Sequence, residues 1–162
     1  MRILIFNLLV ITASSIFLLS CNKNDDSIDP VAIEEIHFNS LESEILYLVN
    51  SHRESIGLNK VSGLNHPYTE ATNHTNYMIN KGIISHDNFE FRKANLMIKS
   101  SAKIILENVA MGYPTAESTM TSWLNSSNHR LVIENPYVQY MGISAQKDAQ
   151  GRNYYTQIFI GK

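Results

Sequence analysis

The sequence has 162 residues, a formal net charge of −2 and a pI near 6.3. This length suits one domain of about 100–200 residues, and a hydrophobic fraction of 44% is enough to build a core. The slightly acidic balance comes without the basic stripe that nucleic-acid binding requires, so we expect no nucleic-acid partner.

The N-terminus has the pattern of an exported lipoprotein. Arg2 precedes an apolar run from Ile3 to Leu19, and Ser20 then stands directly before Cys21, the single cysteine. A small residue before the cleavage point is typical of signal peptides, and this arrangement resembles a bacterial lipobox, whose cysteine carries a diacylglycerol. A plain transmembrane anchor is the alternative, but the run is short for a span of about 20 residues. We predict a signal peptide over residues 1–20 and a lipidated Cys21 that anchors the chain to a membrane.

Residues 21–38 are predicted to form a tether. The stretch after Cys21 is polar and acidic, and Asp29-Pro30 disfavours a helix. Because the one cysteine is assigned to the lipid, the folded part over residues 39–162 has no thiol for a disulfide and depends on its core alone. These features predict an extracytoplasmic location, either in a bacterial periplasm or on the outer surface of the cell.

Helical periodicity marks three segments in the first half of the folded part. They are residues 40–55, 67–81 and 89–99. We expect Ser40 to cap the first helix and Gly82 to end the second. The third helix is expected to turn inward Phe89, Leu96 and Met97.

A strand, a further helix and a hairpin are predicted next. The apolar stretch 104–110 indicates a strand interrupted at Glu107-Asn108, and a helix is expected over residues 115–124. Two alternating stretches, 140–147 and 154–160, predict a β-hairpin. Helices first, then mixed elements, then a hairpin indicate the α+β class. We expect a three-layer α-β-α sandwich, with helices on both faces of a small, mostly antiparallel sheet.

Four stretches of the chain carry motifs in the order found in a known family. They are Asn50–Arg53 with Gly57-Leu58, Ser85-His86-Asp87, Glu107-Asn108-Val109-Ala110, and Trp123 to His129-Arg130. They resemble motifs of the CAP superfamily, which comprises cysteine-rich secretory proteins, antigen 5 and pathogenesis-related proteins. Each motif alone is weak, but together with the hairpin they cover about residues 41–159. The resemblance implies the same α-β-α sandwich over residues 39–162.

The resemblance also implies a central cleft that holds two histidines and two glutamates. His86 and His129 match the two histidines, and Glu107 matches the first glutamate. Ser126 stands where the second glutamate lies in the eukaryotic branch, so the set is reduced to three residues. Secondary candidates at the cleft are Ser126, Arg130 and Asn108.

Two imidazoles and one carboxylate form a ligand set for zinc or another divalent transition metal. In catalytic zinc sites, water takes the fourth position. The three residues are about 20 positions apart in the sequence, so their convergence rests on the resemblance. The alternative is a hydrogen-bonded cluster that ties loops across the cleft, in which Glu107 orients one imidazole. A serine nucleophile at Ser126 or Ser127, near His129, would lack both an elbow motif and a third, orienting acid.

Three functions stay open at this point. The favoured one is a non-enzymatic, membrane-anchored binding or interaction module with a lipid or an envelope partner. Ser126 stands in place of the second glutamate, so a candidate general base is missing. The second is a zinc-dependent hydrolase that uses His86, Glu107 and His129. The third is an inert structural domain of the cell envelope. We expect no cofactor other than the divalent metal.

Overall fold

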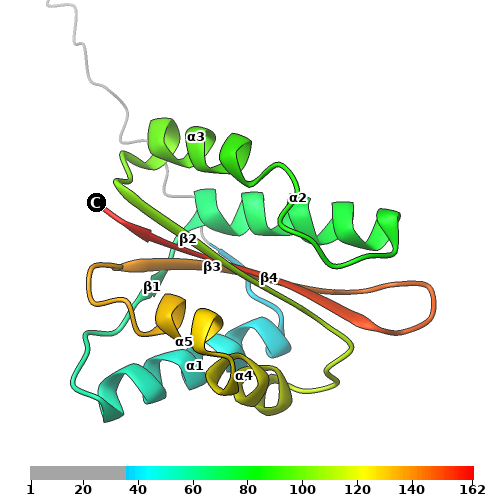
Figure 1. The fold of residues 1–162 in the computed structure, drawn as a ribbon, viewed down its shortest axis with the longest axis horizontal. Helices are drawn as coiled ribbons and strands as arrows, with labels where there is room; N and C mark the ends of the chain where they lie inside the picture. The colour runs from blue at the N-terminus through cyan, green and yellow to red at the C-terminus, as the bar shows by residue number, and fades with distance from the viewer. Residues whose placement is uncertain (1–35) are drawn as a thin grey trace, which may run out of the picture. The chain divides into compact units, whose positions relative to one another are not determined.

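The computed structural model describes residues 36–162 (Figure 1). The predicted signal peptide, Cys21 and the predicted tether up to residue 35 lie outside the described residues. None of the helices between Ile36 and Lys162 combines the length and the apolar character that a bilayer span needs. By their contacts, residues 33–162 form one compact unit.

The described part contains five helices and four strands. In chain order they are α1 (Ser40–Ser55), β1 (Ser62–Gly63), α2 (Asn65–Lys81), α3 (Phe89–Ser100), β2 (Ile104–Met111), α4 (Ala116–Asn125), α5 (Ser127–Ile133), β3 (Tyr140–Lys147) and β4 (Asn153–Gly161). The strands form one sheet in the order β1-β3-β4-β2. β1 pairs with β3 in parallel, and the two other pairs are antiparallel. The predicted α+β class with a mostly antiparallel sheet is therefore confirmed.

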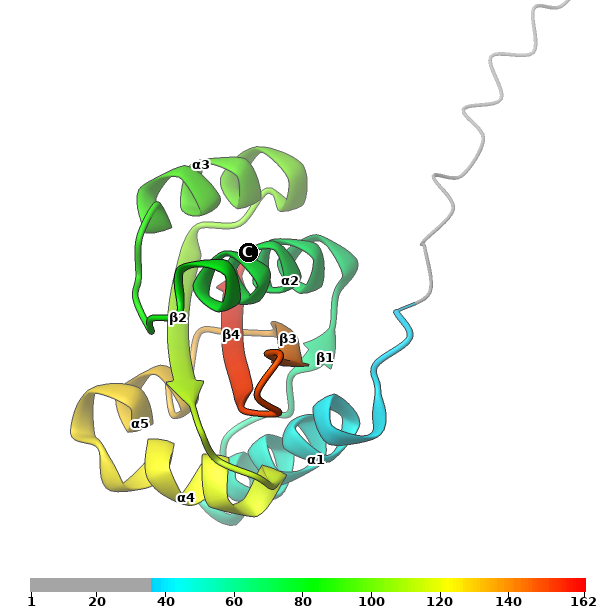
Figure 2. The same cartoon turned by 90° about the vertical axis from the view of Figure 1, so that its right-hand side faces the viewer.

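The sheet lies between two layers of helices. α2 and α3 cover one face, and α1, α4 and α5 cover the other (Figures 1 and 2). All nine residues of the central strand β4 are buried, as expected for a strand with helices over both of its faces. The predicted α-β-α sandwich is confirmed.

The sequence predicts two helix ends, the start of α1 and the end of α2. Local side-chain and backbone chemistry sets both of them. α1 is capped by Asn39, whose side chain accepts a hydrogen bond from the Glu42 N–H (2.9 Å), while the Glu42 carboxylate accepts one from the Asn39 N–H (2.9 Å). This reciprocal capping box satisfies two backbone donors, so the prediction of Ser40 as the cap is wrong. Gly82 ends α2 in the left-handed conformation, as predicted.

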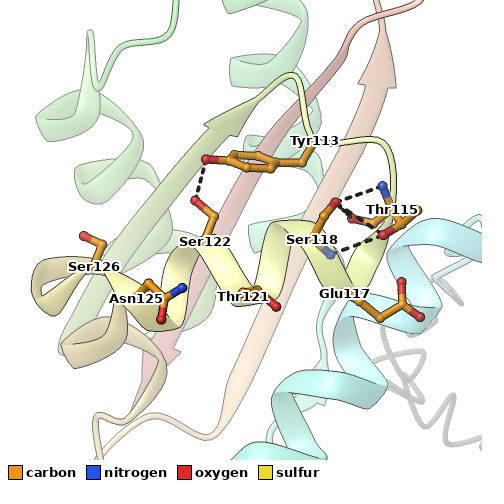
Figure 3. A pocket seen from close by; sticks show the side chains of 8 residues that line it. All are labelled: Tyr113, Thr115, Glu117, Ser118, Thr121, Ser122, Asn125 and Ser126. Atoms are coloured by element: carbon orange, nitrogen blue, oxygen red, sulfur yellow. Dashed lines mark hydrogen bonds between the residues drawn. The ribbon is translucent and has the colours of Figure 1, made fainter.

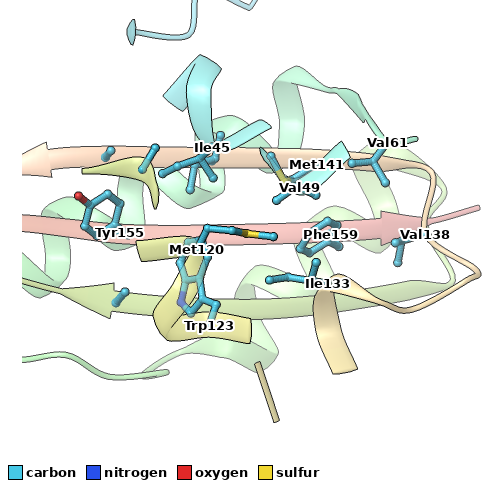
Figure 4. Close-up of a cluster of buried hydrophobic side chains, with 14 residues drawn as sticks. Ile45, Val49, Val61, Met120, Trp123, Ile133, Val138, Met141, Tyr155 and Phe159 are labelled. Atoms are coloured by element: carbon cyan, nitrogen blue, oxygen red, sulfur yellow. The ribbon is translucent and has the colours of Figure 1, made fainter. Parts of the chain in front are cut away.

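The main hydrophobic core lies between the sheet and the layer of α1, α4 and α5 (Figure 4). Trp123 of α4 is fully buried there and donates its indole N–H to the Val109 carbonyl of β2 (3.2 Å). Its ring meets that of Tyr155 edge-on, with centroids 6.4 Å apart. Trp123 thus fixes α4 against β2, the strand that carries Glu107.

On the other face of the sheet, α2 approaches β3 closely at Gly142. A Cβ atom at position 142 would overlap the backbone of Pro67 and Tyr68 in the first turn of α2. About two turns further along α2, the Thr75 hydroxyl donates a hydrogen bond to the Thr156 hydroxyl of β4 (2.9 Å). Glycine at 142 is therefore required by close packing of backbone against backbone.

α3 begins where the sequence predicts it but is rotated relative to the prediction. Leu96 is fully buried and Phe89 packs partly against the core, as expected, whereas Met97 is exposed, so its predicted inward position is wrong. The inner face carries Arg92 instead. A charged residue occupies this face because Glu107 of the adjoining strand supplies its counter-charge.

Candidate functional site

Glu107 is the centre of a polar cluster on β2. β2 is continuous through Glu107 and Asn108, so the interruption predicted there is wrong. Both side chains are buried and both are hydrogen-bonded to other elements. These polar residues can therefore lie inside a strand at the sheet edge without breaking it.

Arg92 forms a two-pronged ion pair with the Glu107 carboxylate. Its Nε donates to Oε2 (2.9 Å) and its Nη2 donates to Oε1 (2.7 Å), the paired geometry that makes arginine–carboxylate contacts strong. Its Nη1 also donates to the Asp87 carbonyl. Sequence reasoning missed Arg92. The available signal was a cation one helical turn before the buried Leu96.

His86 is bound to the same carboxylate. Its Nδ1 donates to Glu107 Oε1 (2.8 Å), and its side chain is about half exposed. An ionised carboxylate only accepts, so Nδ1 carries a proton in this contact. The structure thus brings together two of the three predicted site residues as a hydrogen-bonded pair, the arrangement expected of a cluster in which Glu107 orients an imidazole.

His74 of α2 is a further buried member of this cluster. Its Nε2 donates to the Ser85 carbonyl (2.7 Å) and lies 4.0 Å from Glu107 Oε1. Burial lowers the pKa of His74 despite the attraction of these two partners. For Glu107, burial alone would raise the pKa, but the hydrogen bonds from His86 and Arg92 outweigh it and the net pKa is lowered. The central cluster, defined as His74, His86, Arg92 and Glu107, therefore combines a neutral buried histidine with an ionised carboxylate.

His129 approaches from the opposite helical layer, at the start of α5. Asn108 donates its side-chain amide to the His129 carbonyl (3.1 Å) and to Gln157 Oε1 (3.1 Å), which fixes α5 to the sheet. Burial, and then the nearby His86, lower the pKa of His129. Within residues 36–162, no hydrogen bond or ion pair joins the His129 ring to Glu107.

The predicted ligand set of two histidines and Glu107 does not fit a metal in this arrangement. Both carboxylate oxygens already accept hydrogen bonds from the Arg92 guanidinium, and a metal ion at Glu107 would meet that positive charge. Across the described chain, no group of three or more His, Cys, Asp or Glu side chains is placed to hold a metal ion. Of the predicted ligand set, this leaves only the imidazole nitrogens, His86 Nε2 and those of the His129 ring, to bind a metal ion.

Two adjoining hollows lie beside His129 and along α4. They share Tyr113 and Ser122, whose side chains are joined by a hydrogen bond from Ser122 Oγ to Tyr113 Oη (2.6 Å). The first, the apolar hollow, measures about 180 Å³ and is also lined by Ile84, Val109, Ala110, Met111, Trp123 and His129. The second, the polar groove, measures about 750 Å³ and is also lined by Thr115, Glu117, Ser118, Thr121, Asn125 and Ser126 (Figure 3).

The secondary candidates lie in different parts of the fold. Ser126 ends α4 and lines the polar groove. Arg130 donates from Nη1 to the Leu124 carbonyl at the end of α4 (3.3 Å). Asn108 is buried, and its Oδ1 has no hydrogen-bond partner among the described residues. Of these three residues, only Asn108 adjoins the central cluster, because it follows Glu107 in β2. Its side chain connects β2 to β4 and α5.

We expect the free energy of unfolding to fall as the pH drops below about 6.5. Burial lowers the pKa of His74 and His129 below 6.5 in the folded chain, so the unfolded chain binds protons first and acid favours it. The loss continues below about pH 4.5, where Glu107 becomes protonated in the unfolded chain before it does so in the folded one. Urea unfolding over a pH series measures this. His74→Gln should flatten the upper part of the curve, and the exposed His37→Gln should not. Equal stability at about pH 7 and pH 5 would contradict the expectation.

Comparison with known proteins assigns the chain to a family. Residues 46–159, well over half of the sequence, match the model of the cysteine-rich secretory protein family, CAP. A curated relative, the uncharacterized protein YkwD of Bacillus subtilis, is 29% identical over 124 residues. That match covers 75% of this chain and 47% of YkwD, so the chain spans about half the length of this relative.

Solved structures share the fold. An outer surface protein from Borrelia burgdorferi has a TM-score of 0.68 at 16% identity, over 78% of this chain and 98% of that protein. An extracellular protein with an SCP domain from Bacillus anthracis has a TM-score of 0.65 at 23% identity, over 75% of this chain and 40% of that protein. The family match over residues 46–159 and this common fold agree with the motifs in the sequence. The chain belongs to the cysteine-rich secretory protein (CAP) family.

Proposed function

We propose that this protein is a lipid-anchored, extracytoplasmic binding module that holds its ligand without turning it over. The sequence pattern around Cys21 supports the anchor. The same pattern supports an extracytoplasmic location, and so do relatives described as an outer surface protein and an extracellular protein. The observation that carries binding rather than catalysis is the occupation of both Glu107 oxygens by Arg92.

A general base needs a free lone pair within reach of the substrate and a pKa near the working pH. Glu107 is poorly suited to this role, because Arg92 and His86 occupy three of its four acceptor positions and its pKa is lowered. Ser126 stands where the second glutamate lies in the eukaryotic branch of the family, so a second carboxylate is missing from that position. The cluster is better suited to hold loops around a cleft than to move protons.

The two hollows indicate the shape of the ligand. The apolar hollow of about 180 Å³ is smaller than the ~300–1,000 Å³ of pockets that enclose small molecules. It therefore admits the end of a chain rather than a whole molecule. Through Tyr113 and Ser122 it continues into the hydroxyl-lined polar groove. An elongated ligand with an apolar end and a hydrogen-bonding body fits both.

Trp123 provides the test, because it is the only tryptophan and lines the apolar hollow. We expect octyl glucoside below its micellar concentration, which pairs an apolar chain with a polyhydroxyl head, to change the Trp123 emission saturably in residues 33–162. Ile84→Arg places a charge at the hollow and should weaken binding at least about tenfold. Ile83→Arg, next in sequence, similarly exposed and outside the lining, should not. No saturable change, or equal loss in both variants, would contradict the proposal.

The zinc-dependent hydrolase is the alternative and requires Arg92 to leave Glu107. Zinc retained stoichiometrically by the purified chain and lost in His86→Ala/His129→Ala, together with hydrolysis, would favour it. An inert envelope domain would show neither zinc nor a saturable Trp123 response.

A further inference from the structure

The outer face of α3 carries large apolar side chains that no other part of the described chain covers. Phe91 is 68% exposed and Ile98 is 81% exposed. They are seven residues apart, two helical turns, and so lie on the same side of the helix. Neither belongs to a core cluster of the described chain. The opposite side of α3 is the buried one, and α3 is the outermost element of its layer in both views (Figures 1 and 2).

Basic residues outnumber acidic ones in the segment that carries this apolar ridge. The segment 89–103 holds four cationic residues and one acidic residue, in a protein whose net charge is −2. The charge of Arg92 is balanced by Glu107, so the excess positive charge of the segment comes from its three lysines. They are Lys93, Lys99 and Lys103. Lys93 and Lys99 reach Glu90 and Glu70 only at 3.7 and 3.8 Å, and both lysine side chains are partly exposed. Such contacts leave the lysines free to meet other anions.

We propose that α3 lies on an anionic lipid bilayer, with Phe91 and Ile98 inserted at the boundary between headgroups and acyl chains. An exposed apolar face on a lysine-rich helical segment is the pattern of a helix that rests in the membrane interface, and each lysine near an anionic surface adds attraction. The proposal rests on the proposed anchoring through Cys21. Only 14 residues separate Cys21 from Ile36, which limits the distance between them to about 50 Å.

Anchoring makes a small apolar surface sufficient. Confinement near the bilayer gives the domain a high effective concentration at the lipid, so that a weak contact becomes occupied. With α3 on the lipid, the layer of α1, α4 and α5 lies on the far side of the sheet (Figure 2). The polar groove along α4 would then face away from the membrane, open to a ligand.

The test uses residues 33–162, which form one compact unit and contain no cysteine. An N-terminal histidine tag tethers them to nickel-chelating lipid in vesicles of phosphatidylcholine with phosphatidylglycerol. Ile98→Cys, labelled with an environment-sensitive dye, should shift its emission to the blue on tethering. Tyr47→Cys on α1, whose native side chain is also 68% exposed, is the matched control and should not shift. Without the tether, Phe91→Ser/Ile98→Ser should reduce partitioning into these vesicles at least about tenfold.

A shift at position 98 alone, diminished by Lys93→Gln/Lys103→Gln, would support the proposal. No shift at either position, or equal shifts at both, would overturn it. A shift without vesicles that grows with protein concentration would also overturn it, because a second copy of the chain would then cover the ridge. The artificial tether replaces Cys21, so failure of the lipid anchor leaves this result unchanged. That failure would appear separately, as a mature chain whose mass lacks the diacylglycerol.

Discussion

Replacing Arg92 with methionine is expected to lower the free energy of unfolding by about 3–5 kcal/mol. The side chains of Arg92 and Glu107 are only 6% and 2% exposed, so the variant would leave a buried carboxylate without its cation. Methionine fills a similar volume and is adaptable, which keeps the loss of packing small. Urea unfolding at neutral pH measures the effect. The loss should shrink in acid, where Glu107 can take up a proton instead.

Two further variants separate the ion pair from other effects. Lys93→Met changes the next residue of α3, whose ammonium group is partly exposed and 3.7 Å from Glu90, and should cost less than about 1 kcal/mol. Arg92→Met/Glu107→Leu removes both charges and should recover most of the stability lost in Arg92→Met. If Arg92→Met costs no more than Lys93→Met, the buried pair does not stabilise the fold.

Gly142→Ala is expected to destabilise the protein by about 3 kcal/mol or more, at the upper end of the range for overpacked sites. The added methyl group would meet the backbone of Pro67 and Tyr68, and backbone cannot rotate away as a side chain can. α2 would have to move off β3, which would also strain the hydrogen bond from Thr75 to Thr156. Thermal or urea unfolding provides the measurement.

Ser144→Ala is the matched control for Gly142→Ala. Ser144 lies two residues further along β3, on the same face of the sheet, and is fully buried. Its hydroxyl has no hydrogen-bond partner among the described residues, so its removal should be neutral or slightly stabilising. Equal destabilisation by the two substitutions would mean that the contact with α2 is looser than the structure has it.

The four longer helices and the hairpin could be predicted because their signals are local. α1 covers the predicted residues 40–55, and β3 covers the predicted 140–147. Each depends on a periodic apolar pattern and on residues at its ends. The two-residue strand β1 gives no such signal, because it exists only through its parallel pairing with Tyr140 and Met141. A contact across so many residues of chain cannot be read from a window of sequence.

The candidate site was only partly predictable for the same reason. The family motifs pointed to His86 and Glu107, and the structure joins them by a hydrogen bond. Arg92 and His74 belong to no motif that we recognised, since they enter the cluster from α3 and α2 through the packing of those helices. The exposure of Met97 was missed as well, because the inner face of α3 carries Arg92, which pairs with Glu107.

The pairing of Arg92 with Glu107 also affects how the protein depends on its surroundings. A cation that is part of the chain cannot be removed by a chelator or run short when metals are scarce, and it has no dissociation rate of its own. The loops around His86 would therefore keep their arrangement in a metal-poor environment. Their arrangement would depend on the amino-acid sequence and not on the supply of a metal ion. If the protein is the binding module proposed above, its binding surface gains constancy from this internal counter-ion.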